Sequence, residues 1–314
     1  MVVCMTRPTT PSVERLAEEY RALRDAAAVI DLEPWTVLRL TGKDAREFLQ
    51  GTATQDFGTP SSSGAGARTL FLTEKGRPVA HAWIAFVRDP DAAWVIADPQ
   101  VRSSLRPHLE RFRIMEDVEI EGPDGLPRLL GIAGPERDPL AQAFAAKIAG
   151  AFAIRSEPLS FVLAPRGALA STLPASVDPL AFQAWRIRMG IPLQEIDLDL
   201  DRIATELMLP EAISMSKGCY VGQEVVARTA HRGKLRRQRI GFRFAWGGEP
   251  IPKGIPLRSG GLEMGHVTST AWEPGSAEGL GMGYVAPESL ARDLDILAVQ
   301  GEKTTLLRPQ SWPL

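Results

Sequence analysis

The sequence predicts an α+β protein of several domains that ends in a small β-barrel. A chain of 314 residues exceeds the size at which one hydrophobic core usually divides, so two or three domains are expected. Through the first two thirds, short strands in local hairpins alternate with amphipathic helices, which favours α+β layers over a doubly wound sheet. Toward the C-terminus, short strands follow one another between glycine-rich turns, as in a small barrel.

These changes in pattern divide the chain into three regions. Residues 1–128 are expected to form an N-terminal α+β region, and residues 129–234 a second α+β region that carries the polar stretch from Lys217 to Glu224. Residues 235–314 are expected to form the barrel, because the basic stretch that ends near Lys234 separates them from the helical sequence before it. This division defines the domains that the sequence predicts.

The N-terminal region begins with a helix expected over residues 12–28. Leu16 and Tyr20 recur at helical spacing, and Ser12 can cap the start. Alternating or compact apolar runs indicate strands over 35–40, 68–72, 78–87, 93–97 and 118–121. Further helices are expected over 41–50 and 100–111.

The second region mixes strands and helices, and the third contains mostly strands. Strands are expected over 129–133, 151–154 and 160–164, and helices over 139–149, within 165–173 and over 178–189. Gly190-Ile191-Pro192 ends the last of these helices. The barrel strands are expected over 240–244, 263–269, 280–284, 294–299 and 304–307.

The composition is typical of a soluble globular protein, with 44% hydrophobic and 24% charged residues. The net charge of −2 gives no overall reason to expect nucleic acid or a membrane as partner. The two cysteines, Cys4 and Cys219, are not expected to pair, because Cys4 lies in a terminal stretch expected to be loose. Because the first residues also lack the pattern of a secretory signal, we expect a cytoplasmic protein, and a monomer.

Metal and nucleotide motifs do not occur in the sequence. The histidines are scattered without the short spacing of a zinc site, so no metal site is predicted. No glycine-rich phosphate-binding loop occurs either. Asp197, Asp199 and Asp201 suggest a calcium loop at first sight, but the required glycine and glutamate are missing, so a solvated turn is expected.

The densest polar chemistry lies in the stretch Lys217-Gly218-Cys219-Tyr220-Val221-Gly222-Gln223-Glu224, called the thiol motif below. Its two glycines permit backbone angles and close approaches that other residues resist. After Gly222 the pattern becomes helical, which predicts a tight turn leading into a short helix. From the local residues alone, a structural turn that happens to contain a cysteine is an equally good interpretation.

A basic run follows the thiol motif, from Arg228 to Arg239. It contains few aromatic side chains of the kind that stack on single-stranded nucleic acid, so a small anion such as a glutamate tail suits it better. A solvated face at a domain edge is the alternative. Trp35 and Trp185 offer flat faces of the kind that a heteroaromatic ligand needs, although tryptophans more often belong to the core.

The thiol motif resembles the Lys-Gly-Cys-Tyr-x-Gly-Gln-Glu signature of the YgfZ-type folate-binding proteins, which are relatives of the T-protein of the glycine cleavage system. The segment from Trp35 to Ala45, followed by Phe48-Leu49-Gln50-Gly51, is similar to the N-terminal segment of that family. Gly190-Ile191-Pro192 and Gly265-His266-Val267-Thr268-Ser269 resemble further family segments and occur in the same order. The resemblance therefore covers most of the chain.

The resemblance implies two α+β domains and a C-terminal barrel, arranged around a central cavity for tetrahydrofolate or a one-carbon or polyglutamyl derivative of it. It implies an accessory role in making or repairing iron–sulfur clusters, with iron–sulfur enzymes or cluster assembly proteins as partners. Cys219 is the expected catalytic thiol. The folate-binding residues that the resemblance implies are Trp35, Trp185, Lys217, Tyr220, Gln223, Glu224 and Arg228.

Two alternatives stay open at this point. The transferase relatives carry a carboxylate that acts on the folate. Here Ser104 falls near that place, and Asp98 is the nearest acid. Arg188 stands at a second position, where the relatives often have a glutamate. A folate-dependent aminomethyltransferase would therefore depend on Asp98. An interaction module would instead dock an acidic partner on the basic face, with an association that weakens as salt is added.

Overall fold

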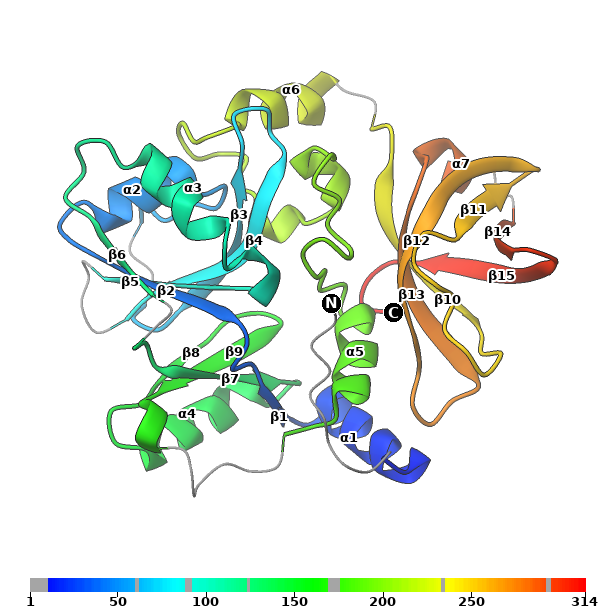
Figure 1. The fold of residues 1–314 in the computed structure, drawn as a ribbon, viewed down its shortest axis with the longest axis horizontal. Coiled ribbons are helices and arrows are strands. Elements are labelled where there is room, and N and C mark those ends of the chain that lie inside the picture. Colours follow the sequence, from blue (N-terminus) through cyan, green and yellow to red (C-terminus); the bar gives the residue numbers. More distant parts are fainter. Residues whose placement is uncertain are drawn as a thin grey trace.

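The computed structural model describes residues 11–59, 62–87, 92–122, 125–168, 176–232, 235–291 and 295–314. Figure 1 shows two sheets with their helices on one side of the molecule and a barrel on the other, with helix α5 (Pro179–Arg188) between them. This arrangement confirms the predicted α+β class with a C-terminal barrel. The division into domains at residues 128 and 234 stays a prediction.

The first sheet has the strand order β3-β4-β5-β2-β6, and all neighbours are antiparallel. Its strands are β2 (Thr36–Thr41), β3 (Gly66–Leu72), β4 (Pro78–Phe86), β5 (Ala93–Ala97) and β6 (Glu119–Glu121). Helices α2 (Ala45–Thr52) and α3 (Leu105–Phe112) pack on this sheet, where Phe48 and Leu105 share a buried cluster with Phe71. Burial of each such side chain stabilises the fold by about 1.5–3 kcal/mol.

The second sheet has the strand order β1-β7-β9-β8 and is also antiparallel. Its strands are β1 (Ala28–Asp31), β7 (Arg128–Ala133), β8 (Phe152–Ile154) and β9 (Leu159–Ala164). Helix α4 (Arg137–Lys147) covers it, and helix α1 (Val13–Asp25) packs against α5. Four short 3₁₀ helices occur in the described residues: η1 (Pro99–Val101), η2 (Arg166–Ala168), η3 (Ala204–Leu207) and η4 (Pro210–Ala212).

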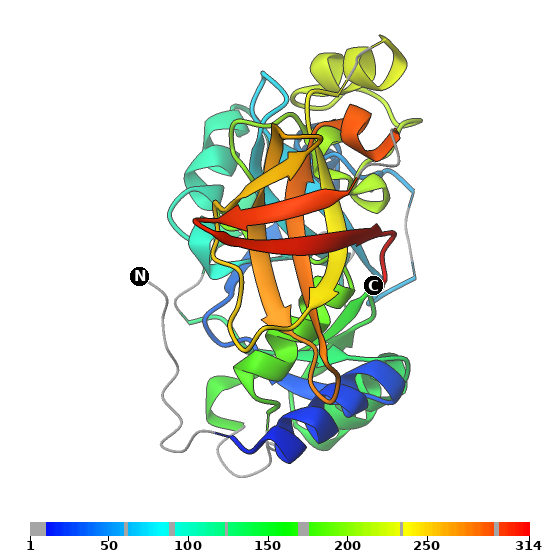
Figure 2. The same cartoon turned by 90° about the vertical axis from the view of Figure 1, so that its right-hand side faces the viewer.

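The C-terminal strands form a closed barrel in the order β10-β13-β12-β11-β14-β15. They are β10 (Gln238–Ala245), β11 (Pro256–Ser259), β12 (Leu262–Trp272), β13 (Glu278–Val285), β14 (Ile296–Gln300) and β15 (Lys303–Gln310). Figure 2 shows β14 and β15 crossing in front of β10, β12 and β13. Glycine at position 281 permits this closure, because a Cβ there would lie 2.2 Å from the Phe242 ring. Helix α6 (Gln223–Arg232) precedes the barrel strands, and the short helix α7 (Pro287–Ala291) lies between β13 and β14.

The helix expected over residues 100–111 is wrong in its first half. The Asp98 carboxylate accepts a hydrogen bond from the Gln100 N–H at 2.8 Å and caps η1, and α3 begins only at Leu105. Pro107 is the third residue of α3, where a missing N–H costs little because first-turn amides have no intrahelical partner.

Other differences from the predicted elements follow from tertiary pairing. Strand β1 begins at Ala28, where the first helix was expected to end, because pairing with β7 satisfies its extended backbone. Helix α2 runs from Ala45 to Thr52, so it begins and ends later than the helix expected over 41–50. Strand β11 and helix α7 were not predicted. Residues 169–175 and 292–294, parts of a predicted helix and a predicted strand, lie outside the described residues, as does Cys4.

Buried charges join the barrel to the segment after α5. Arg186 pairs with Asp197 at 2.7 Å, and Thr268 of the barrel donates to the same carboxylate at 2.7 Å. Burial alone would raise the pKa of Asp197, but Arg186 and the hydrogen bonds outweigh it and hold the pKa below its usual value. The expected solvated turn is therefore wrong at Asp197, which is fully buried.

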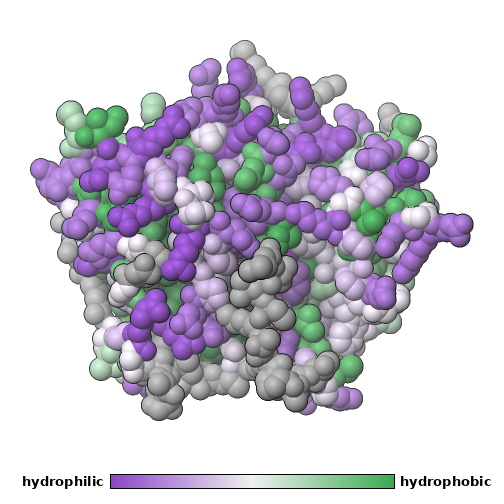
Figure 3. Space-filling view, viewed as in Figure 1, coloured by the Kyte–Doolittle hydropathy of each residue, from purple (hydrophilic) through white to green (hydrophobic). Residues whose placement is uncertain are grey.

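One face of the molecule is mostly polar. Figure 3 shows mainly hydrophilic residues over this face, with hydrophobic patches separated by hydrophilic ones. The most exposed large apolar side chains, Ile114 and Met115, lie between α3 and β6. Across the part of the chain that the structure describes, no helix is long and apolar enough to span a membrane.

Candidate functional site

Lys217 fastens the thiol motif to the end of helix α2. Its ammonium donates to three backbone carbonyls, those of Gln50 at 2.6 Å, Ala53 at 2.7 Å and Gln55 at 2.8 Å. The last carbonyls of a helix lack an intrahelical donor and carry partial negative charge, so a cation is stabilised there. The three ammonium hydrogens are thereby all used. Burial lowers the pKa of Lys217 to about 8, an effect that Asp56 partly offsets.

The other end of the thiol motif is held between the same helix end and the turn that joins β3 to β4. The Val221 N–H donates to the Gly51 carbonyl at 3.1 Å. Gly222 has a φ of 82°, and a Cβ there would lie 2.7 Å from the Thr73 carbonyl oxygen. Helix α6 begins at the next residue, Gln223, so the predicted turn leading into a short helix is confirmed.

Cys219 lies between these two attachments, and its side chain is exposed. Tyr220 is buried instead, and its ring centroid lies 5.2 Å from the Lys217 ammonium. Glu224 and Arg228 of α6 are exposed. The motif therefore presents one thiol to solvent on a backbone that is fixed on both sides.

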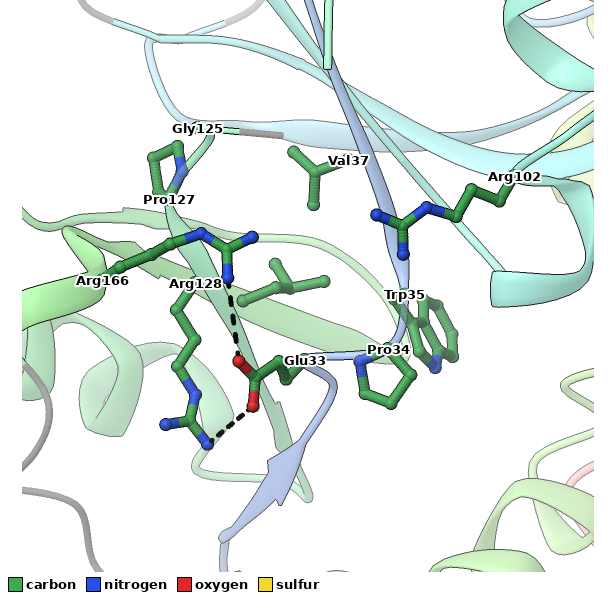
Figure 4. A pocket seen from close by; sticks show the side chains of 10 residues that line it. Glu33, Pro34, Trp35, Val37, Arg102, Gly125, Pro127, Arg128 and Arg166 are labelled. Atoms are coloured by element: carbon green, nitrogen blue, oxygen red, sulfur yellow. Dashed lines mark ion pairs between the residues drawn. The ribbon is translucent and has the colours of Figure 1, made fainter. Parts of the chain in front are cut away.

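A second candidate region is a cavity of about 430 Å³ lined by the ends of elements from the first and second sheets. Trp35, at the start of β2, lines it together with the charged residues Glu33, Arg102, Arg128 and Arg166. In Figure 4, Arg102 and Arg166 reach into this space from opposite sides. A cavity of this volume lies within the range of small-molecule sites. We call it the Trp35 cavity.

The charged groups of the Trp35 cavity are loosely paired. Arg128 Nη2 donates to Asp31 at 2.9 Å, but the Glu33 carboxylate lies 3.5 Å from Arg128 and 3.8 Å from Arg166. The buried Nε of Arg128 has no hydrogen-bond partner among the described residues. Arg102 also lines the cavity, so three guanidinium groups border it together with the Glu33 carboxylate.

Aromatic contacts lead from Trp35 into the interior. The Trp83 ring centroid lies 5.7 Å from that of Trp35 and 4.7 Å from that of His81. Arg68 donates from Nε to His81 Nε2 at 3.2 Å. Burial, helped by Arg68 and Arg239, holds the pKa of His81 well below its usual value, so the imidazole is neutral at pH 7. Burial also lowers the pKa of Arg68, to about 10.

Trp35 and Trp185 belong to one buried cluster, and of the two Trp35 lines the cavity. Trp185 is 2% exposed and stacks on Phe182 with centroids 6.1 Å apart. Neither Cys219 nor Lys217 is among the described residues that line the Trp35 cavity. The folate contacts predicted for Trp35, Trp185, Lys217, Tyr220, Gln223, Glu224 and Arg228 stay predictions.

The arginines of the Trp35 cavity could not be predicted as site residues from the sequence. Arg102 precedes α3, Arg128 begins β7 and Arg166 begins η2, so these residues lie far apart in the chain. Each one alone is indistinguishable from an exposed surface arginine. Only Glu33, directly before Pro34 and Trp35, gave a local signal, as a charged residue beside an aromatic one.

Asp98, the acid nearest the place of the transferase carboxylate, and Arg188, which departs from the transferase pattern, have local structural partners. Asp98 caps η1, and burial raises its pKa to about 6. Arg188 pairs with Glu273 at 3.1 Å, and Tyr20 donates to the same carboxylate at 2.9 Å. Within the described ranges, no group of His, Cys, Asp and Glu side chains is placed to hold a metal ion.

The fold and this sequence match known proteins. Residues 5–164, half of the chain, match the family model of the GCVT N-terminal domain, and the chain therefore belongs to that family. Its fold is similar to the crystal structure of glycine cleavage system aminomethyltransferase T from Bartonella henselae, with a TM-score of 0.81 and 19% identity. The match covers 95% of this chain and 89% of that one, and at this identity it shows the fold alone.

Two sequence relatives carry the resemblance further. The mitochondrial iron–sulfur cluster assembly factor IBA57 of Homo sapiens is 26% identical, over 92% of this chain and 86% of its own length. The tRNA-modifying protein YgfZ of Pectobacterium atrosepticum is 27% identical, over 68% of this chain and 69% of its own length. Together with the fold, these similarities confirm the resemblance to the YgfZ-type proteins and to the T-protein.

Proposed function

We propose that the protein is a tetrahydrofolate-binding accessory protein that supports the synthesis or repair of iron–sulfur clusters in specific enzymes. The observation that carries the proposal is the exposed thiol of Cys219, held in place by Lys217 and by the close packing of Gly222. The name of a relative aligned over 92% of the chain, an iron–sulfur cluster assembly factor, supports the same role.

The thiol of Cys219 suits transient work on a cluster. Thiolate sulfur is the common protein ligand of cluster iron, and it also exchanges with other thiols and disulfides. A cluster is held by several thiolates, so one cysteine supplies one ligand while the client or assembly protein supplies the others. The cluster is cargo in this scheme, and the fixed backbone on both sides of Cys219 keeps Sγ on the outside, where a partner reaches it.

The Trp35 cavity fits a reduced folate by its chemistry. Trp35 offers an aromatic surface to a pterin ring, and the Glu33 carboxylate can accept hydrogen bonds from pterin N–H groups. Arg102, Arg128 and Arg166 supply positive charge for an anionic ligand. A bound reduced folate would supply a carrier of one-carbon groups. The residues of this chain bind and orient it.

The test of the proposed function is complementation in cells that lack the protein. The wild-type gene should restore the activity of iron–sulfur enzymes, and Cys219→Ser should not. Ser216→Ala, a change at an exposed neighbour in the same loop, is the matched control and should restore activity fully. Full restoration by Cys219→Ser would contradict the proposal.

A second candidate function is a folate-dependent aminomethyl transfer. It is favoured by the pKa of Asp98, which burial raises to about 6, near the range in which a carboxylate exchanges protons at neutral pH. This candidate predicts that the purified protein forms methylene-tetrahydrofolate from an aminomethyl donor and that Asp98→Asn slows the reaction. Absence of any turnover by the wild-type protein would dismiss it.

A further inference from the structure

We propose that Arg128 and Arg166 form an anion subsite in the Trp35 cavity, which binds the carboxylate end of a ligand whose aromatic part lies against Trp35. The inference rests on the proposed function, because it assigns the negatively charged tail of the folate to these two arginines. It differs from the expectation from the sequence, in which the basic run after the thiol motif bound that tail.

The first observation behind the subsite is that two accessible guanidinium groups line the cavity. The side chains of Arg128 and Arg166 are 22% and 54% exposed. Arg128 donates from Nη2 to Asp31 at 2.9 Å, and Arg166 donates from Nε to the Leu126 carbonyl at 3.1 Å, so each guanidinium has further N–H groups for a ligand. Guanidinium groups bind carboxylates through parallel hydrogen bonds, which makes a carboxylate the fitting partner.

The second observation is that the existing counter-charge is easily displaced. Glu33 lies 3.5 Å from Arg128 and 3.8 Å from Arg166, beyond good hydrogen-bond length, and both Glu33 and Arg166 are about half exposed. Exposed ion pairs of this kind contribute little to stability. A ligand carboxylate can therefore replace Glu33 between the two arginines at little loss, and Glu33 then becomes available to the donors of the ring.

The third observation is the position of the aromatic surface. Trp35 and the three arginines line one cavity of about 430 Å³, and the apolar side chains of Val37 and Leu129 complete its wall. Figure 4 shows Arg102 on the same side of this space as Trp35 and Arg166 across from it. A ligand with a flat ring at one end and a negative charge at the other fits this cavity, with its ring against Trp35 and its charge at Arg166.

Calorimetric titration of the full-length protein tests the subsite with two probes: tetrahydrofolate, which carries the glutamate tail, and tetrahydropterin, which lacks it. Tetrahydrofolate should bind at least about tenfold more tightly than tetrahydropterin. Arg166→Gln should weaken tetrahydrofolate binding by about tenfold and leave tetrahydropterin binding unchanged. Arg128→Gln should act in the same direction, and Arg106→Gln, at an exposed arginine of α3 outside the cavity, should change neither affinity.

The outcomes separate the subsite from the proposed function. Equal affinities for the two probes, or an Arg166→Gln protein that binds tetrahydrofolate as the wild type does, would overturn the anion subsite and leave folate binding standing. Failure of the wild-type protein to bind either probe would overturn the folate part of the proposed function, and the subsite with it. Arg166 is exposed enough that its variant should fold, as circular dichroism would verify.

Discussion

The thiol motif and the Trp35 cavity satisfy their polar groups in opposite ways. In the thiol motif, the Lys217 ammonium donates to three carbonyls at 2.6–2.8 Å, and Gly222 fits against the Thr73 carbonyl. In the Trp35 cavity, Glu33 pairs with two arginines at 3.5 and 3.8 Å, and a buried N–H of Arg128 has no partner among the described residues.

This difference shows what each region is suited to do. A group whose hydrogen bonds are all made within the protein holds one geometry, so the thiol motif is suited to presenting a single atom, the Cys219 sulfur. A region with loosely paired charges around a hollow can exchange its partners, which suits reversible binding of a ligand. The predictions below test whether the two regions behave as a fixed support and as an adaptable cavity.

The largest effect is expected from Lys217→Met, which keeps the aliphatic stem and removes the ammonium. Three carbonyls at the end of α2 would lose their donor, so the free energy of unfolding should fall by about 3 kcal/mol. Urea denaturation measures this change. Lys253→Met is the control, because Lys253 donates to one carbonyl, that of Glu195, at the surface and should cost less than about 1 kcal/mol.

A smaller effect is expected from pH, through His81 behind the Trp35 cavity. Its pKa in the folded protein lies well below the value of about 6.5 in the unfolded chain. Below pH 6.5 the unfolded chain therefore binds a proton that the folded protein does not, and stability falls as the pH falls. The contribution is about 1.4 kcal/mol per pH unit.

Urea denaturation between pH 6.5 and pH 5 measures this dependence. In His81→Gln, the free energy of unfolding should depend less steeply on pH. The slope should fall by the amount that corresponds to about one proton, because the substituted residue does not titrate. Parallel curves for the wild type and His81→Gln would show that His81 is charged or exposed in the folded protein.

A still smaller effect on stability is expected from Arg166→Gln in the Trp35 cavity. Arg166 makes a long, half-exposed ion pair with Glu33 and donates from Nε to the Leu126 carbonyl at 3.1 Å, so the loss of both should change the free energy of unfolding by about 1 kcal/mol or less. The contrast with Lys217→Met distinguishes a cavity that exchanges partners from a fixed support. A loss of 2 kcal/mol or more, roughly the cost of breaking a buried pair, would place Arg166 in the structural frame instead.

The smallest effect on stability is expected from Cys219→Ser. The side chain is exposed, so the free energy of unfolding should change by less than about 0.5 kcal/mol. Titration of the native protein with a thiol reagent should lose its fast-reacting group in this variant. A marked destabilisation would mean that the thiol serves the fold and not a partner.

The sequence predicted the elements better than the site. The compact apolar run of residues 78–87 and the helical spacing after Ser12 depend on local chemistry, and both elements form as expected. The turn at Gly222 was predictable because glycine permits a positive φ and a helical pattern begins directly after it. Strand β1 was missed, because only its pairing with β7 decides its conformation.

The site could be predicted only in the part that is contiguous in the chain. The thiol motif lies within eight residues, so its chemistry could be read directly from Lys217 to Glu224. The Trp35 cavity combines residues from several distant elements, and no spacing in the sequence brings Arg102, Arg128 and Arg166 together. Cys219 is not among the described residues that line the Trp35 cavity, and the single site that the sequence predicts for Cys219 and Trp35 stays a prediction.

The central proposal is that the Cys219 thiol and folate binding in the Trp35 cavity are separate functions of one protein. The most direct test is calorimetric titration of tetrahydrofolate into the wild-type protein and into Cys219→Ser. The account predicts saturable binding to both, with dissociation constants that agree within about twofold, a difference below roughly 0.5 kcal/mol. Loss of binding in Cys219→Ser, or no binding to either protein, would contradict it.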